Sequence, residues 1–256
     1  MLFYKIQMRK KISLLTLAIA LTVPCGAIAS VDTKKSQTCD FFTDTYLSIG
    51  AGVSMPSNKI KHLVPISEYD EYDYRSTRLK KSEAYRISLG KSFDNFRSEV
   101  EFLYGRKYKS KYDTDIQYDK SIFNVSSYSY FLNGFYDFKN FNDTVVPYVG
   151  AGIGLSRNHL SNEKLTLSVD NVDEPIMTII GKKKTSFAWN IGLGVMFNIN
   201  KHLAFDLSYK YTDLGKLKGS KDELHADTGD ISEGEKYNVK GKLRNNVLLA
   251  SFVVKF

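Results

Sequence analysis

Histidine is the side chain best suited to acid–base or metal chemistry near neutral pH, and the sequence contains four. His62, His159 and His225 lie in three separate polar segments, and His202 lies in a short stretch between two apolar runs. None of them shows the His-x-x-x-His spacing of a zinc site or stands beside paired aspartates. We therefore expect no catalytic residue and no metal site, and we keep a rim-located enzyme only as an alternative.

Three glycines recur at every second position, at Gly150, Gly152 and Gly154. A dinucleotide-binding loop needs a helix directly after its glycines, because the helix N-terminus holds the phosphates. Here the glycines alternate with apolar residues and no helical pattern follows. The run is typical of one face of a strand, and no cofactor is expected.

One polar segment carries residue types that favour protein contacts. Residues 67–81 read SEYDEYDYRSTRLKK, with tyrosines placed between acidic and then basic residues. Tyrosine and arginine are enriched among the side chains that dominate binding energy at protein interfaces. The candidate contact residues are Tyr69, Tyr72, Tyr74, Arg75 and Arg78. A solvated loop with no partner is the alternative interpretation of the same segment.

A second set of charged residues lies within segments that are otherwise apolar at every second position. Its members are Arg86, Arg97, Glu99, Glu101, Asp206 and Lys210. Isolated charges would be costly inside a protein, so we expect these residues to pair across neighbouring strands. An ion path is the functional alternative to such a structural network.

The elements that must position these residues are strands. In residues 187–199, large apolar residues from Phe187 to Ile199 take every odd position, and small or polar residues take the even ones. Such alternation indicates a strand with two different faces. Similar segments occur eight times along the chain, at residues 46–54, 84–91, 96–106, 122–136, 145–156, 187–199, 203–212 and 244–256. The phase of residues 122–136 is ambiguous, because Phe131 and Phe135 oppose the tyrosines of that segment.

The connections between these segments alternate strictly in length. Long ones of roughly 15 to 31 residues follow short ones of roughly 3 to 8 residues. Alternating connections with an even strand count are typical of bacterial outer-membrane barrels, whose long loops lie outside the cell. The sequence thus predicts an all-β, eight-stranded antiparallel up-and-down transmembrane barrel over residues 45–256, with its larger apolar face toward lipid and both termini in the periplasm.

The first residues predict an export signal. A basic start is followed by an uncharged apolar run at residues 12–23, which is too short to cross a bilayer as a helix. The small-x-small pattern ending at Ala29 predicts cleavage before Ser30, so residues 1–29 are a signal peptide and 30–44 a short periplasmic segment. Cleavage would leave Cys39 as the only cysteine of the mature chain, without an intramolecular disulfide partner.

Half of the net positive charge of the sequence belongs to the predicted export signal. The chain of 256 residues has 36 Lys and Arg against 28 Asp and Glu, a formal net charge of +8. Four of the basic residues lie within the first eleven, which leaves 32 against 28 and a net charge of +4. The last long connection mixes both signs of charge. We therefore expect no nucleic-acid partner.

Four short runs are similar to those of a known group of proteins: residues 97–104 (RSEVEFLY), 133–137 (NGFYD), 146–155 (VPYVGAGIGL) and 251–256 (SFVVKF). They resemble the opacity-like porins and the related rickettsial-type surface antigens and adhesins. The resemblance implies an eight-stranded surface barrel of a Gram-negative bacterium with adhesion as its role, and it transfers no binding residue. The expected partners are outer-membrane lipid, a host cell-surface protein, and the barrel assembly machinery through the strand that ends at Phe256. A narrow porin or channel is the main alternative.

Overall fold

The structure is a computed structural model that describes residues 43–65, 72–112, 120–139, 144–169, 172–219, 222–225, 231–233 and 239–256. The predicted signal peptide with its cleavage site at Ala29 and Ser30, most of the predicted periplasmic segment, Cys39 and Tyr69 lie outside these ranges. No helix that is long and apolar enough to cross a membrane occurs within the described ranges.

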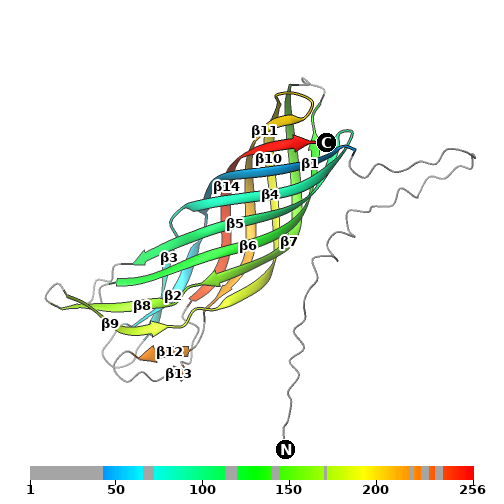
Figure 1. Ribbon diagram of the computed structural model, residues 1–256. Coiled ribbons are helices and arrows are strands. Elements are labelled where there is room, and N and C mark those ends of the chain that lie inside the picture. Colours follow the sequence, from blue (N-terminus) through cyan, green and yellow to red (C-terminus); the bar gives the residue numbers. More distant parts are fainter. Residues whose placement is uncertain are drawn as a thin grey trace, which may run out of the picture. The chain divides into compact units, whose positions relative to one another are not determined.

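Eight long strands form a closed antiparallel barrel, as the sequence predicted (Figure 1). They are β1 (Thr45–Pro56), β4 (Ser82–Phe93), β5 (Phe96–Tyr112), β6 (Lys120–Asp137), β7 (Val145–Leu160), β10 (Lys183–Asn198), β11 (Leu203–Lys218) and β14 (Val239–Lys255). Each strand pairs with its neighbour along the chain, β14 pairs with β1, and no strand edge of the barrel wall is left unpaired over the described registers.

Six shorter strands lie in the connections that the sequence analysis interpreted as long loops. They are β2 (Lys59–Pro65), β3 (Tyr72–Arg78), β8 (Glu163–Val169), β9 (Val172–Ile179), β12 (Asp222–His225) and β13 (Ile231–Glu233). β2 and β3 form a hairpin, and β2 also pairs with the start of β14. β8 and β9 form a second hairpin against β6, and β12 joins it through β9. These connections are thus partly ordered strand structure rather than plain loops.

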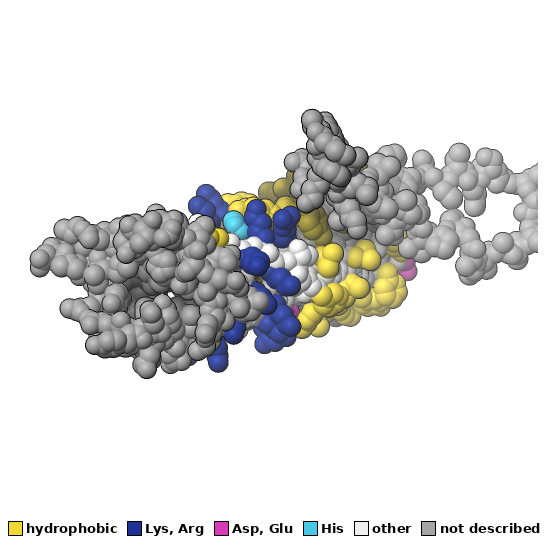
Figure 2. All heavy atoms as spheres, turned by 90° about the horizontal axis from the view of Figure 1, so that it is seen from below, with side chains coloured by type: hydrophobic (Ala, Val, Ile, Leu, Met, Phe, Trp, Pro, Cys, Tyr) yellow, Lys and Arg dark blue, Asp and Glu magenta, His cyan; other side chains and the backbone are white. Residues whose placement is uncertain are grey.

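The two faces of the barrel wall differ in the way the alternation predicted. On β10, Phe187, Ile191 and Leu193 are at least half exposed, whereas Ala188 and Asn190 are buried. β6 resolves the ambiguity in the sequence, because Phe131 and Phe135 point inward and Tyr128, Tyr130 and Tyr136 point outward. Exposed apolar side chains occur on all eight strands, and Figure 2 shows such side chains gathered in one zone on the face that it presents. Such a belt fits the hydrocarbon layer of a membrane.

Aromatic side chains border this belt on both sides. Tyr104 stacks on Tyr128 with ring centroids 4.8 Å apart, and Trp189 lies 5.6 Å from Tyr211. At the opposite border Phe96 packs edge-on against Tyr136 at 5.1 Å. Tyrosine and tryptophan gather where apolar lipid meets water, so the two rows mark the two borders of the lipid-facing belt.

Candidate functional site: the extended end of the barrel

The two ends of the barrel differ in construction. At one end the short connections β4–β5, β6–β7 and β10–β11 meet, together with Phe256; we call it the turn end. At the other end the strands continue past the aromatic row and carry the hairpins of β2–β3 and β8–β9; we call it the extended end. In the tight β4–β5 turn Asp94 adopts a φ of 52°, a conformation that aspartate tolerates better than most residues.

The polarity of the two faces inverts where the strands pass into the extended end. On β14, Leu248 and Phe252 point outward within the belt, but Lys240 and Lys242 take the outward positions beyond it. The inward positions there hold the fully buried Leu243. A wall that is basic outside and apolar inside is the arrangement of a water-soluble barrel. The inversion therefore places the edge of the membrane between these two parts of the same strand.

The same inversion occurs on the other elements of this end. Ile60 on β2 is buried between the exposed Lys59 and Lys61, and Leu79 is buried between Arg78 and Lys80. The inward side chains together form one apolar cluster in the extended end. It consists of Ile60, Leu79, Ala84, Leu103, Tyr108, Phe123, Val125, Phe131, Leu160, Ala188, Leu214, Leu217, Val239, Leu243, Val247 and Leu249. The extended end thus has a hydrophobic core of its own.

The outer surface of this end is strongly basic. Figure 2 shows Lys and Arg side chains gathered beside the apolar belt. The exposed cations, which we call the basic surface, are Lys59, Lys61, Arg78, Lys80, Lys81, Arg106, Lys107, Lys109, Arg157, Lys182, Lys183, Lys184, Lys216, Lys218, Lys240 and Lys242. Two acidic side chains described at this end are both paired: Glu83 with Arg106 at 2.8 Å and Asp213 with Arg244 at 3.0 Å. The barrel wall directly beyond the belt therefore carries an excess of positive charge, whereas β3, β8, β9, β12 and β13 also contain acidic residues.

His159 lies within this basic environment, near the end of β7 and beyond the belt. Partial burial, followed by the positive charges of Lys183 and Arg157, holds the pKa of His159 below its ordinary value. The imidazole is consequently neutral at pH 7. Its titration reports the local field, because an anion bound at the basic surface would raise this pKa.

Four of the five candidate contact residues lie on one element. Tyr72, Tyr74, Arg75 and Arg78 belong to β3, where they pair with residues of β2 from Pro65 back to Lys59. The segment that the sequence singled out is therefore a hairpin strand, with Arg78 exposed at its end.

The predicted interior charges come together at the centre of the barrel. Arg86 lies 3.6 Å from Glu99, 3.7 Å from Glu101 and 3.5 Å from Asp206. Lys210 also forms an ion pair with Glu101. All of these side chains are at most 3% exposed. We expected pairs between neighbouring strands, and Arg86 on β4 makes such pairs with β5, but its contact with Asp206 and that of Lys210 with Glu101 cross the barrel interior.

Arg97 does not join the central network by an ion pair. Its Nε donates to both carboxylate oxygens of Asp137, at 2.8 and 2.9 Å, near the turn end. The partner Asp137 was missed in the sequence analysis, although it takes an inward position on β6 and lies in the NGFYD run. Its pairing with Arg97 depends on the β5–β6 register, which the sequence does not show.

Uncharged side chains donate further hydrogen bonds to the carboxylates of the central network, a role that the sequence did not indicate. Tyr148 donates to Asp206 at 2.6 Å, and Tyr46 donates to Glu99 at 3.1 Å. Asn133 donates to Glu101 at 3.2 Å. All three take inward positions of the two-residue period, which is the signal that could have identified them.

The four histidines are not brought together by any described strand pairing. His62 lies on β2 opposite Val239, His225 on β12 opposite Met177, His159 on β7 and His202 in the β10–β11 turn. Within the described ranges, no group of three or more His, Cys, Asp or Glu side chains is placed to hold a metal ion.

A model of the outer membrane protein beta-barrel domain matches residues 18–256 of the sequence. The chain belongs to this family. It is 30% identical to the outer membrane protein PagN of Salmonella typhimurium (strain LT2) over 128 residues, which cover 50% of this chain and 49% of PagN. It is 27% identical to opacity protein opA67 of Neisseria gonorrhoeae over 169 residues, which cover 55% of this chain and 72% of opA67. The chain thus spans about half the length of PagN.

Among solved structures, the chain is similar to the outer membrane protein OprG of Pseudomonas aeruginosa. The TM-score is 0.53 at 14% identity, and the match covers 84% of this chain and 96% of OprG. At this identity the likeness concerns the fold. Family and fold together establish an outer-membrane surface protein associated with membrane lipid, and they confirm the predicted barrel class.

Proposed function

We propose that this protein is an adhesin or surface antigen whose extended end faces outward from the cell and binds molecules of a host surface. The observation that supports this proposal most directly is that the polarity of the inward and outward faces inverts along continuous strands. A barrel that served only as an anchor would end at the aromatic row, whereas this one continues as a water-facing unit with its own core. Under this proposal the turn end and both termini lie in the periplasm.

The hairpin of β2 and β3 is the proposed contact element. β3 carries Tyr72, Tyr74, Arg75 and Arg78, and the hairpin is joined to the barrel wall through the pairing of Lys61 and His62 with β14. An element held in one orientation loses less entropy on binding than a free loop does. Tyrosine and arginine supply the side chains that most often dominate such contacts.

The lower part of the basic surface has a second role in this proposal. Arg157 and Lys183 lie two and four residues beyond the outward belt residues Leu155 and Phe187, so they lie at the depth of lipid headgroups. Cations at that depth attract anionic headgroups by about 1 kcal/mol each. They would fix the height of the barrel and keep the contact hairpin above the membrane surface.

A non-catalytic role fits the same observations. The histidines lie on separate elements. The relatives reported above are named as outer-membrane and opacity proteins. These facts support the surface-display proposal over an enzyme at the rim, and assays of His62→Ala, His159→Ala and His225→Ala variants for lost protease or lipid-modifying activity would decide between them.

The test is adhesion of whole bacteria to host cells. The combined variant Tyr72→Ser, Tyr74→Ser, Arg75→Ser and Arg78→Ser should lower adhesion to the level of cells without the protein. The matched control is Lys182→Ser with Lys184→Ser, two exposed cations of which the first directly precedes β10 and the second lies at its start. Surface amounts of all variants are equalised with an antibody against an added epitope. Unchanged adhesion of the β3 variant, and also of a variant lacking residues 222–233, would contradict the proposal.

A further inference from the structure

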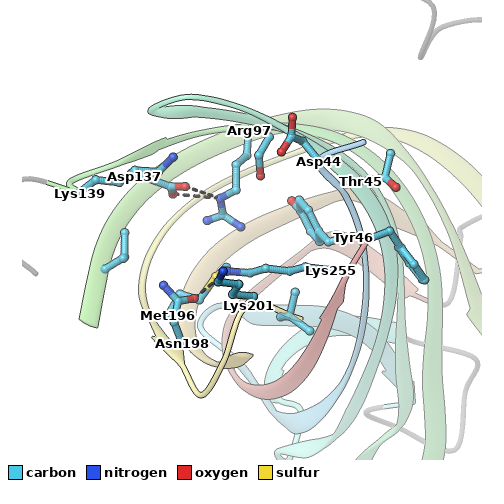
Figure 3. A pocket seen from close by; sticks show the side chains of 14 residues that line it. Asp44, Thr45, Tyr46, Arg97, Asp137, Lys139, Met196, Asn198, Lys201 and Lys255 are labelled. Carbon is cyan, nitrogen blue, oxygen red and sulfur yellow. Dashed lines mark hydrogen bonds and ion pairs between the residues drawn. The ribbon is translucent and has the colours of Figure 1, made fainter. Parts of the chain in front are cut away.

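A cavity of about 240 Å³ opens at the turn end, the end opposite to the proposed contact hairpin (Figure 3). Tyr46, Val146, Met196 and Val253 form its apolar floor and belong to one buried cluster. Charged side chains line the rest of its wall. It therefore combines a closed apolar base with a polar mouth, as small-ligand sites do.

Arg97 is the best-fixed of these charged groups. Its side chain is 5% exposed, and the carboxylate of Asp137 holds its Nε from both oxygens. The rings of Phe135 and Tyr148 lie 4.9 and 4.7 Å from its guanidinium carbon. Nη2 of Arg97 has no hydrogen-bond partner in the described part of the chain. A buried guanidinium with an unmatched N–H group is costly unless an acceptor completes it.

A second cation shares the cavity with Arg97. Figure 3 shows the guanidinium of Arg97 and the amino group of Lys255 entering the same part of the cavity from different strands. Lys255 Nζ donates to Asn198 Oδ1 at 2.7 Å, a partner that carries no charge. Two like charges in one partly buried space repel, and an anion between them reverses the sign of that interaction.

The wall as a whole favours an anion. Lys139 and Lys201 add two positive charges to those of Arg97 and Lys255, whereas the acidic side chains of the lining are Asp44 and Asp137. Asp137 is already held by Arg97. A phosphate group suits this arrangement, because the planar guanidinium presents two parallel donors and an ammonium supplies a mobile one.

We propose that the turn-end cavity binds a phosphate group between Arg97 and Lys255. The volume exceeds that of a bare ion, so a small phosphate monoester or the headgroup of a phospholipid fits as well as inorganic phosphate. This inference concerns the end of the barrel that takes no part in the proposed adhesion, and neither proposal depends on the other.

The experiment titrates the full chain, folded in micelles of an uncharged maltoside detergent, with sodium phosphate in a calorimeter at constant ionic strength. Sodium chloride is the reference titrant. The key variant is Lys255→Gln, because this side chain is only partly buried and its loss leaves the barrel wall intact. Arg97→Lys keeps the charge that Asp137 needs while removing the two parallel donors. The matched control is Lys182→Gln at the extended end, which should bind phosphate as the wild-type chain does.

Saturable binding of phosphate that weakens by about tenfold or more in Lys255→Gln and in Arg97→Lys is the expected result. A second arm uses dihexanoyl phosphatidylglycerol below its micelle concentration. If dihexanoyl phosphatidylglycerol binds more tightly than inorganic phosphate, the bound phosphate group belongs to a lipid headgroup. If the two bind equally, it belongs to a free phosphate compound. Absence of saturable binding of both probes to the wild-type chain, or binding that Lys255→Gln leaves unchanged, would overturn the proposal.

Discussion

Lys210 on β11 forms an ion pair with Glu101 on β5 across the full width of the barrel. In the closed sheet the order β5-β4-β1-β14-β11 separates the two strands by four steps, so they stand on opposite walls of an eight-stranded barrel. Arg86 reaches the same carboxylate at 3.7 Å from β4. The central network therefore ties opposite walls together in addition to the hydrogen bonds between adjacent strands.

Replacing Lys210 by Met should destabilise the barrel strongly. The change leaves Glu101 with less compensating charge in a site where neither partner is more than 2% exposed. Breaking a buried pair from one side typically costs about 3–5 kcal/mol in the free energy of unfolding. Urea titration in lipid vesicles measures it through the fluorescence of Trp189, the single tryptophan. The double variant Lys210→Met, Glu101→Gln should recover at least half of the loss, and a single variant as stable as the wild type would refute the role of the pair.

A methyl group added at Gly194 should also destabilise the fold. The new Cβ would overlap the ring of Tyr148, whose hydroxyl donates to Asp206 at 2.6 Å. Overpacking of this kind costs about 1–3 kcal/mol. Gly134→Ala is the matched control, because it faces outward and nothing lies within 4 Å of its added Cβ. Equal free energies of unfolding for Gly194→Ala and Gly134→Ala would contradict the prediction, because they would show that the ring of Tyr148 can move aside without a loss of stability.

These two sites show how far the sequence could be interpreted. Lipid contact selects large apolar residues at every second position, so residues 187–199 predicted a strand, its phase and its lipid-facing side. The same rule fails on residues 239–247, because Lys240 and Lys242 replace the apolar outward residues once β14 leaves the lipid. The strands were therefore predicted too short. The polarity of β14 inverts at the membrane edge, while its pairing with β11 continues beyond it.

The partners of the inward charges were less predictable. Parity along a strand indicates that Arg97 and Glu99 face inward, but the pairing of Arg97 with Asp137 requires the β5–β6 register. The ion pair of Lys210 and Glu101 requires, in addition, the closure of the sheet and the diameter it imposes. A sequence pattern specifies which face a residue takes, whereas a contact across a barrel depends on every register in the ring.

The wild-type chain should show no large, stable conductance in planar lipid bilayers. Along the barrel axis, buried apolar side chains fill the extended end, the ionic network fills the centre, and Tyr46, Val146, Met196, Ala204 and Val253 pack at the turn end. Eight strands leave room for side chains rather than for a water-filled path. A stable open level in single-channel recordings, abolished by Arg86→Met, would instead support the channel alternative.

The titration of His159 should reveal anionic headgroups beside the basic surface. In maltoside micelles its pKa should lie below the ordinary value near 6.5, because burial and the charges of Lys183 and Arg157 disfavour the imidazolium. Because the pKa is lowered, the folded state takes up the proton less readily than the unfolded chain, so stability is unaffected above pH 6.5 and declines as the pH falls through the folded pKa.

In micelles doped with an anionic phospholipid the pKa of His159 should rise, since phosphate groups near Arg157 and Lys183 offset their charges. The imidazole shifts in an NMR pH titration measure both values. A combined Arg157→Gln, Lys183→Gln variant should raise the pKa of His159 in plain micelles and abolish the effect of the anionic lipid. If the pKa of His159 in the wild-type chain is the same with and without the anionic lipid, the headgroups do not lie beside this surface.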